Sequence, residues 1–410
     1  MSLVLVIIIS LFFKSAPKLD IFCENTKKSF QILNIISIFA AKMAGIYIHI
    51  PFCKSRCVYC GFYSTTLLNL RQRYVDAVCR EMEIRTHSDT ISTIYLGGGT
   101  PSQLSIRQLH QLFKALNNIN KVENDAEVTI EMNPDDVTAE YATALPQLGI
   151  NRVSMGVQTF DDRRLRFLNR RHTAAQVPTA VERLRRAGIR NISIDLMYGF
   201  PDETLDDWQH DIDAALALNV EHLSAYSLMY EEGTALFELM NKEQITKSDE
   251  ETERQMYDVL IDRLTAAGYE HYEISNFARP GYRSRHNSSY WTDVPYIGLG
   301  AAAHSYDLKS RYWNVDDIEQ YIKGIETGNP IVEREEIDVP TRYNDRVMLS
   351  LRTCEGLDMS LLSPAERSHC LEQARPFLSG GKLCQRDGRL VLTRQGLFVS
   401  DMVMSRLMQV

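Results

Sequence analysis

The middle of the chain alternates short apolar runs with longer amphipathic stretches. Runs typical of β-strands cover residues 45–50, 93–96, 127–132, 152–157, 192–196 and 222–226. Between them, residues 69–86, 105–116, 139–148, 174–187 and 205–218 carry apolar side chains at helical spacing. Gly149 and Gly188 directly follow two of these stretches, and glycine is typical just past a helix end. Six strands, each followed by a helix, predict a parallel sheet with right-handed crossovers.

Six units are fewer than the eight of a closed barrel, so we expect an open, partial (β/α)6 barrel over residues 43–230. From residue 231 the alternation stops. Helical patterns follow at 250–267, 316–327, 341–353 and 363–380, and strands at 383–386 and 389–393 flank a hairpin signal, Asp387-Gly388. We therefore predict an α/β fold with a C-terminal α+β extension. It comprises a barrel extension at 231–340 and a winged-helix-like domain at 341–410, which we interpret as a lid or docking module.

The first 42 residues carry two apolar patches, at 3–13 and 32–41. The first patch is too short to span a bilayer comfortably, and no basic residue precedes it, which argues against a signal peptide. Met43 stands directly before the first predicted strand. We interpret residues 1–42 as an apolar extension that is absent from the native protein or loosely attached to it. The alternative is a membrane-associating anchor.

Composition and charge exclude some classes of protein. With 44% hydrophobic and 24% charged residues the chain is ordinary for a globular protein, and its net charge of −8 argues against a nucleic-acid-coating role. Eight cysteines in 410 residues are too sparse for a disulfide scaffold. Free thiols fit a reducing compartment. We expect a cytoplasmic protein, with a peripheral place at the inner face of the membrane as a refinement.

Three of the cysteines stand close together, as Cys53-Lys-Ser-Arg-Cys57-Val-Tyr-Cys60. Three thiolates at this spacing are able to hold three irons of a [4Fe–4S] cluster, which normally has four cysteine ligands. Phe62 stands where a fourth would follow. One iron would then stay open for an external ligand, as in catalytic metal sites. The alternatives are a structural zinc site, with His49 as its nearest further ligand, and unligated cysteines.

Polar and small residues follow the predicted strands, where parallel α/β folds gather their functional groups. Gly97-Gly98-Gly99-Thr100 follows the second strand, and three glycines allow either a tight turn or close backbone approach to a ligand. Glu131 is suited to accept hydrogen bonds from a ribose diol or an amine. Gln158, Arg170 and Asp195 are suited to anchor a carboxylate or hydroxyl groups. Each is singly more typical of an ordinary polar residue, but together they indicate a site.

These residues resemble the radical S-adenosylmethionine (SAM) superfamily. The resemblance covers most of residues 45–230 and is carried by the segments 47–53, 97–101, 156–160, 169–170 and 195–201. It implies that Cys53, Cys57 and Cys60 hold a [4Fe–4S] cluster whose open iron binds SAM, so that the reduced cluster is able to cleave it. It further implies SAM contacts from Tyr47, Tyr59, Gly98, Gly99, Thr100, Glu131, Gln158, Arg170 and Asp195.

Within that superfamily the chain resembles the branch that contains oxygen-independent coproporphyrinogen III dehydrogenase (HemN) and the HemW-type heme chaperones. HemN has a fourth cysteine where this chain has Phe62, whereas HemW-type proteins have phenylalanine. Gly61 departs from the aspartate usual there. The resemblance implies a chaperone that binds heme and delivers it to a recipient hemoprotein, with a membrane-bound recipient as a refinement. It also implies an electron donor for the cluster and no nucleic-acid partner. Oxidative decarboxylation of coproporphyrinogen III and another tetrapyrrole modification remain the alternatives, so enzymatic activity stays open.

Two further segments carry the resemblance to HemW-type proteins: His286-Asn287-Ser-Ser-Tyr290-Trp291 and the glycine-rich segment 298–305, which contains His304. A neutral imidazole is a natural axial ligand of heme iron. The resemblance therefore implies heme contacts from His286, Asn287, Tyr290, Trp291 and His304, with Arg279, Arg283 and Arg285 near the propionates. The alternative is a capped turn with core aromatic residues and a solvated charged face.

Overall fold

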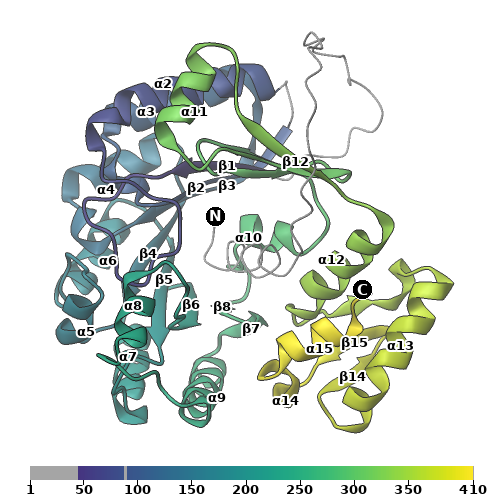
Figure 1. Ribbon diagram of the computed structural model, residues 1–410. Coiled ribbons are helices and arrows are strands. Elements are labelled where there is room, and N and C mark those ends of the chain that lie inside the picture. The colour runs from purple at the N-terminus through teal and green to yellow at the C-terminus, as the bar shows by residue number, and fades with distance from the viewer. Residues whose placement is uncertain (1–44, 87–89, 410) are drawn as a thin grey trace.

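The computed structural model describes residues 45–86 and 90–409. A twelve-stranded sheet runs through it in the order β12-β11-β10-β9-β1-β2-β3-β4-β5-β6-β8-β7. Its centre is six parallel strands, which curve around an open interior in Figure 1. They are β1 (Gly45–Ile50), β2 (Thr90–Gly98), β3 (Lys121–Met132), β4 (Arg152–Gln158), β5 (Asn191–Tyr198) and β6 (His222–Ser227). The predicted partial barrel is confirmed, and no closed barrel forms among the residues described.

The parallel strands alternate apolar and polar side chains along their length. On β4, Val153, Met155 and Val157 belong to the main hydrophobic core, whereas Arg152 and Ser154 line an internal cavity. The other strands repeat this pattern, because successive side chains of a strand point to opposite faces of the sheet. The outer face is therefore a hydrophobic layer and the inner face a polar one.

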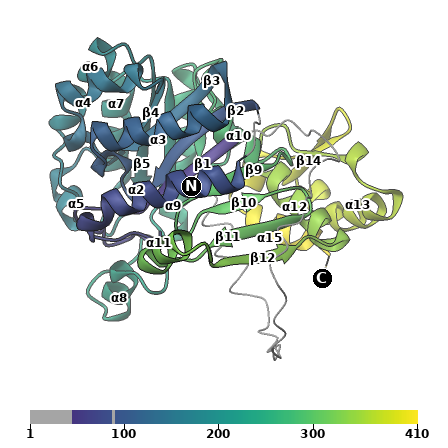
Figure 2. The ribbon, with the colours of Figure 1, turned by 90° about the horizontal axis from the view of Figure 1, so that it is seen from above.

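Helices cover the outer face of the sheet, as Figure 2 shows from above. They bury the apolar outer side chains of the strands, and two begin with a capping box, at Ser105 and Thr204. They are α2 (Arg71–Arg85), α3 (Ile106–Ile119), α4 (Ala139–Gln147), α5 (Asp162–Phe167), α6 (Gln176–Arg186), α7 (Leu205–Ala217) and α9 (Glu250–Ala266). All but the short α5 were predicted within a few residues.

The region 231–340 extends the sheet at both edges, which the sequence did not predict. β9 (Tyr296–Leu299) pairs parallel to β1 and leads into the antiparallel strands β10 (His304–Tyr306), β11 (Ser310–Asn314) and β12 (Val332–Glu336). At the other edge, β8 (Asn276–Ala278) pairs with β6, and β7 (Glu270–Glu273) with β8. α8 (Ala235–Asn241) and α11 (Ile318–Glu326) complete the region, while α10 (Arg285–Tyr290) lies inside the curve of the sheet (Figure 1).

The C-terminal unit has the winged-helix-like arrangement expected from the sequence. The predicted hairpin is present, and both Asp387 and Gly388 have positive φ angles, as a tight type I′ turn requires. Its hydrophobic cluster includes Tyr47, Tyr290 and Trp291, so this unit packs against the barrel's inner aromatic residues. Its elements are α12 (Val339–Leu351), β13 (Leu357–Asp358), α13 (Pro364–Ser379), β14 (Leu383–Arg386), β15 (Arg389–Leu392), α14 (Arg394–Leu397) and α15 (Ser400–Leu407).

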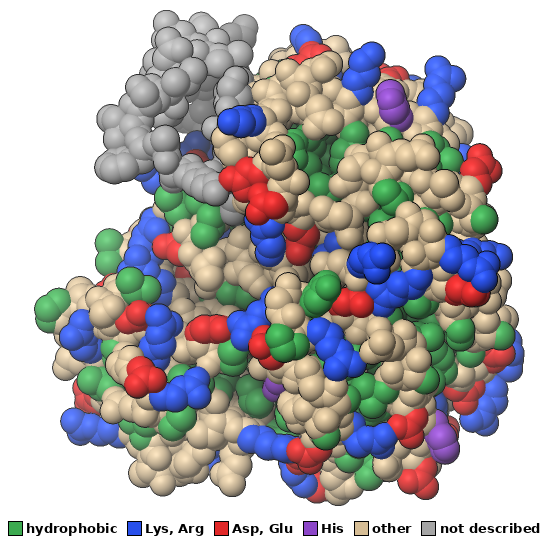
Figure 3. Space-filling model, turned by 180° about the vertical axis from the view of Figure 1, so that it is seen from behind, with side chains coloured by type: hydrophobic (Ala, Val, Ile, Leu, Met, Phe, Trp, Pro, Cys, Tyr) green, Lys and Arg blue, Asp and Glu red, His purple; other side chains and the backbone are tan. Residues whose placement is uncertain are grey.

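The expectation for residues 1–42 lies outside the described residues. Among the described helices, none combines the length and apolar character needed to cross a membrane. On the face shown in Figure 3, Lys and Arg side chains are interspersed with Asp and Glu.

Candidate functional site

The cavity inside the sheet opens at the carboxyl ends of the parallel strands, where the cysteine loop follows β1. The loop is held at both ends by backbone hydrogen bonds. Cys53 N donates to Thr65 O at 2.9 Å, Thr65 N to Pro51 O at 2.7 Å, and Val58 N to Leu168 O at 3.3 Å. All three cysteines of the loop line the cavity. The backbone therefore presents the three thiols to one space.

Two polar groups contact the thiols directly. Cys53 Sγ lies 3.5 Å from Thr100 Oγ1, and Arg170 Nη1 donates to Cys57 Sγ at 3.5 Å. Burial raises the pKa of Cys53, and it raises the pKa of Cys60 to about 12. Without a metal these thiols hold their protons, and a bound metal is what makes buried cysteines into thiolates. The Arg170 contact places a positively charged group beside the sulfur of Cys57.

Arg170 is fixed by two further hydrogen bonds. Its Nη2 donates to Asn133 Oδ1 and to Gly156 O, each at 2.6 Å. A Cβ on Gly156 would lie 2.8 Å from Gln158 Nε2 and 3.1 Å from Arg170 Nη2, so a side chain at this position would crowd both groups. Gly99 is crowded in the same way on the other side of the loop, because a Cβ there would lie 3.1 Å from Cys53 Sγ. Two glycines therefore make the space in which the loop and Arg170 meet.

Glu131 lies deeper on the inner face. Tyr95 Oη donates to Glu131 Oε1 at 2.7 Å, and Gly98 N donates to Glu131 Oε2 at 3.1 Å. Burial raises the pKa of Glu131 and raises that of Asp195 to about 7. The cavity thus holds two acidic groups that would accept hydrogen bonds from hydroxyl or amino groups of a ligand.

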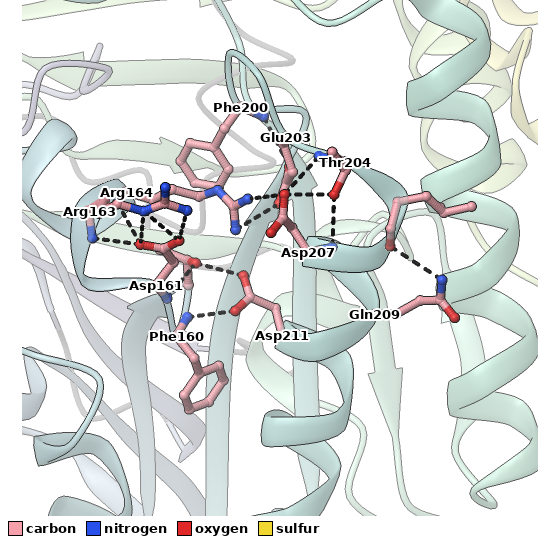
Figure 4. Close-up of polar contacts among 12 residues, drawn as sticks. Phe160, Asp161, Arg163, Arg164, Phe200, Glu203, Thr204, Asp207, Gln209 and Asp211 are labelled. Atoms are coloured by element: carbon pink, nitrogen blue, oxygen red, sulfur yellow. Dashed lines mark hydrogen bonds and ion pairs between the residues drawn. The ribbon is translucent and has the colours of Figure 1, made fainter.

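A buried network behind the cavity holds the loop that follows β4 (Figure 4). Asp211 on α7 accepts a hydrogen bond from Phe160 N at 2.8 Å, and Arg164 on α5 pairs with Asp207 at 2.9 Å and with Glu203 at 3.6 Å. These contacts tie the segment between Gln158 and Arg170 to the loop that follows β5. They fix the path by which α5 returns Arg170 to the cysteines.

Two residues with left-handed backbone mark the ends of that segment. Gln158 has φ of 70° at the point where the β4–β5 register shifts, and its side chain lines the cavity. Asn169 has φ of 60°, and its Nδ2 donates to Arg56 O at 2.8 Å, so it joins the segment to the cysteine loop. Such conformations are uncommon outside glycine and persist where the surrounding structure holds them.

The donor set fits an iron–sulfur cluster better than a zinc ion. Among the described residues, no three His, Cys, Asp or Glu side chains converge on a position for a single metal ion. A cubane differs, because each thiolate binds a different iron. His49, the further zinc ligand considered, shares one ring nitrogen with Tyr47 Oη at 3.0 Å and the other with Tyr63 O at 3.1 Å. Both ring nitrogens of His49 are therefore engaged in hydrogen bonds, and zinc binding would have to break one of them.

Of the residues that the resemblance assigns to SAM, Tyr47 alone does not line the cavity. It is fully buried, stacks on Tyr95 and belongs to the cluster shared with the C-terminal unit. The residues that do line it are Tyr59, Gly98, Gly99, Thr100, Glu131, Gln158, Arg170 and Asp195. The strand-end pattern thus identified a set of residues that the fold brings together.

The residues assigned to heme are distributed differently. Asn287 lines the cavity, whereas His286 is fully buried with both ring nitrogens engaged, by Thr93 Oγ1 and Tyr290 Oη, each at 2.8 Å. Binding of iron by His286 would require one of these hydrogen bonds to break.

His304 lies on β10, apart from the cavity, and stacks on Trp313 at 5.3 Å. No hydrogen bond joins its ring nitrogens to another described residue. Burial lowers the pKa of His304 to about 4, so the imidazole is neutral near pH 7.

The arginines considered for the propionates are already partnered. Arg279 donates to Ala267 O at 2.6 Å, Arg283 contacts Glu270 and Glu355, and Arg285 donates to Asp125 O at 2.6 Å. Conversely, the sequence assigned no ligand contact to several other residues that line the cavity: Tyr95, Asn133, Arg152, Ser154, Asn169, Arg171, Met197, Ser224 and Tyr226. The polar residues that alternate with apolar ones along the predicted strands were the signal for this inner face.

Comparison with known proteins agrees with this site. The model of the radical SAM superfamily matches residues 47–215, and the model of the HemN C-terminal domain matches residues 337–399. The solved structure of coproporphyrinogen III oxidase (HemN) from Escherichia coli has a TM-score of 0.80 at 23% identity, covering 90% of this chain and 91% of that one. This likeness shows the fold alone. The fold and the three-cysteine loop define a radical SAM protein.

Two curated relatives identify the family more narrowly. Heme chaperone HemW of Bacillus subtilis (strain 168) is 39% identical over 321 residues, which are 77% of this chain and 85% of that protein. Heme chaperone HemW of Mycobacterium tuberculosis (strain ATCC 25618 / H37Rv) is 34% identical over 372 residues, 89% of this chain and 94% of that protein. The chain belongs to the HemW family.

Proposed function

We propose that this protein is a heme chaperone of radical-SAM architecture, which binds heme and delivers it to a recipient hemoprotein. The observation that carries the proposal is the identity of 39% to a protein named a heme chaperone, over 85% of that protein's length. The cavity supports it, because it joins a three-cysteine loop to a polar interior suited to small polar ligands.

Cys53, Cys57 and Cys60 would hold a [4Fe–4S] cluster with one iron open to SAM. SAM bound there supplies the chemistry of reductive S–C bond cleavage when the cluster is reduced. The chain's own groups bind and orient: Arg170 donates a hydrogen bond to Cys57, Thr100 contacts Cys53, and Glu131 accepts hydrogen bonds deeper in the cavity. Gly98, Gly99, Gln158, Tyr59 and Asp195 would complete the SAM contacts. Tyr47 would not contact SAM itself but would position Tyr95, on which it stacks.

For heme, His304 is the better axial ligand of the two histidines. No hydrogen bond joins its ring nitrogens to another described residue, whereas both nitrogens of His286 are occupied. Trp291 and Tyr290 pack in the cluster shared with the C-terminal unit and would support the heme segment from within.

Phe62 favours a chaperone over a coproporphyrinogen III dehydrogenase. It lines the cavity two residues after Cys60, at the position of the fourth cysteine in HemN. Decarboxylation of coproporphyrinogen III remains the second candidate function, since the fold is shared with HemN at a TM-score of 0.80. We further propose a cytoplasmic location, a membrane-bound recipient and an external electron donor. The domain boundaries proposed are 43–230, 231–340 and 341–410.

Anaerobic reconstitution with iron and sulfide, followed by two assays, tests the proposal. We expect one heme per chain by absorption titration, transfer of that heme to an apo-hemoprotein, and no protoporphyrinogen from coproporphyrinogen III with SAM and reductant. Cys53→Ser should lose most of the cluster iron, and Cys384→Ser, an exposed cysteine of the C-terminal hairpin, serves as the matched control. Turnover of coproporphyrinogen III, or a wild-type protein that fails to bind heme, would contradict the proposal.

A further inference from the structure

Arg152 is an unpaired buried charge. It begins β4, its side chain is 1% exposed, and it lines the inner part of the cavity. Neither its Nε nor its Nη1 has a hydrogen-bond partner among the described residues. Its guanidinium forms no ion pair, since no carboxylate oxygen of a described residue lies within 4.0 Å of its nitrogens. The other cavity-lining arginine with a fixed place, Arg170, is by contrast held by Asn133 and Gly156.

An isolated buried guanidinium is costly, because it loses its hydration without gaining a partner. Buried charges in proteins are normally paired or hydrogen-bonded. The two acidic groups of the cavity give Arg152 only partial compensation. Glu131 is committed to Tyr95 and Gly98, and burial raises the pKa of Asp195 to about 7. The positive charge of Arg152 is therefore not fully compensated by the protein, and an anionic ligand would compensate it.

A second unpaired polar group faces the same cavity. Asn287 of α10 is 8% exposed and lines the cavity, and its buried Oδ1 has no hydrogen-bond partner in the described part of the chain. Its side-chain amide donates to no other described residue, so both ends of the amide are available to a ligand. A guanidinium presents a planar fork of N–H donors that matches the two oxygens of a carboxylate, and an amide N–H is a suitable additional donor.

We propose that Arg152 and Asn287 form a carboxylate-binding subsite at the inner end of the cavity. The proposal deepens the proposed function and rests on it for the identity of the ligand. Arg152 precedes Gly156 by four residues on β4, which corresponds to about 13 Å along a strand. A carboxylate held near the cysteines is therefore a different group from the one bound by Arg152. The two sources with this chemistry are a propionate of heme and the amino-acid carboxylate of a SAM molecule other than the one at the open iron.

The test compares each ligand with a form that lacks the carboxylate, on the cluster-reconstituted protein under anaerobic conditions. Heme is titrated against heme dimethyl ester by absorption, and SAM against decarboxylated SAM by calorimetry. If the source is heme, wild type should bind heme at least tenfold more tightly than the diester. Arg152→Gln should lose that preference with little change in diester affinity, and Arg152→Lys should keep part of it. Arg183→Gln is the matched control, because this arginine lies on the outer helix α6 and donates to Val137 O.

Each outcome decides the proposal. Loss of the preference between SAM and decarboxylated SAM, with the heme preference unchanged, supports the subsite and assigns it to SAM. An equal weakening of acid and ester forms in both pairs would overturn it, because the guanidinium would then only support the fold. If Arg152→Gln does not fold, as judged by near-UV circular dichroism, Asn287→Ala replaces it and should weaken the same preference. Wild type that binds no heme would defeat the proposed function, while the SAM pair would still decide the subsite.

Discussion

Replacing Gly99 by alanine should displace the cysteine loop without straining the backbone. Gly99 does not have a positive φ, so alanine is conformationally tolerated there. The obstacle is steric. A Cβ on Gly99 would lie 2.7 Å from both the carbonyl carbon and the oxygen of Pro51, and 3.1 Å from Cys53 Sγ.

The required displacement follows from these contacts. Ordinary van der Waals contact for a Cβ begins at 3.4 Å, so the backbones must separate by 3.4 − 2.7 = 0.7 Å. The nearest atoms belong to backbone that is held by the hydrogen bond from Gly99 N to Ile50 O, 2.9 Å long. Overpacking of this kind costs about 1–3 kcal/mol, which a domain with a stability of about 5–15 kcal/mol survives. The protein should therefore fold with Cys53 out of place.

The assay is anaerobic reconstitution with measurement of iron and sulfide per chain and of the electron paramagnetic resonance spectrum of the reduced cluster, with and without SAM. We expect a lower iron content and a weaker spectral response to SAM in Gly99→Ala. Gly380→Ala is the control, because its Cβ meets Pro376 O at 3.0 Å in the C-terminal unit, away from the cysteines. A variant with wild-type iron content and the wild-type response to SAM would refute the reasoning.

Two further predictions separate roles that the sequence alone could not. His304→Ala should weaken the heme absorption band in an absorption titration while leaving the fold intact. His286→Ala removes hydrogen bonds to Thr93 and Tyr290, so it should lower the free energy of unfolding by about 2–3 kcal/mol, as measured by urea denaturation. Burial raises the pKa of Glu203 from its ordinary value of 4.5 to about 7. Between these two pH values the folded protein binds more protons than the unfolded chain, so the free energy of unfolding falls as the pH rises. The unfolding free energy of wild type relative to Glu203→Gln should therefore fall by about 3 kcal/mol from pH 4.5 to 7, and a constant difference in denaturation curves would contradict it.

The sequence predicted the parallel core well because its strands are set by local pattern. Strand β1 was predicted with the bounds that the structure shows, and the five strands after it within a few residues. The short strands β7 to β12 were missed, since strands of three to five residues are fixed by the edge they pair with and less by their own composition. Helix α10, Arg285–Tyr290, was also missed, because its sequence lacks apolar periodicity. Contacts with another element fix it instead: the Glu127 carboxylate accepts hydrogen bonds from the backbone nitrogens of Arg285 and His286.

For the site, the sequence predicted which residues stand at the strand ends, but not where the heme-assigned side chains point. Residues at strand ends converge because parallel strands finish at one edge of the sheet, and that rule needs only the order of the elements. The heme residues were identified by a motif, and a motif does not state direction. Its Asn287 faces the cavity, while His286, one residue earlier, points into the hydrogen bonds that anchor α10.

The alternation within the strands explains why Arg152 is informative. Parallel strands covered on both faces by helices read as continuous apolar runs, so a polar residue at every second position indicates that one face lines a space. Most of the inner polar groups satisfy one another: Tyr95 pairs with Glu131, and His222 pairs with Ser193 and Tyr272. Such pairing is what a closed polar interior requires. Arg152 breaks this pattern together with Asn287. An interior that pairs most of its polar groups but leaves a guanidinium and an amide open is one whose remaining partner arrives with the ligand.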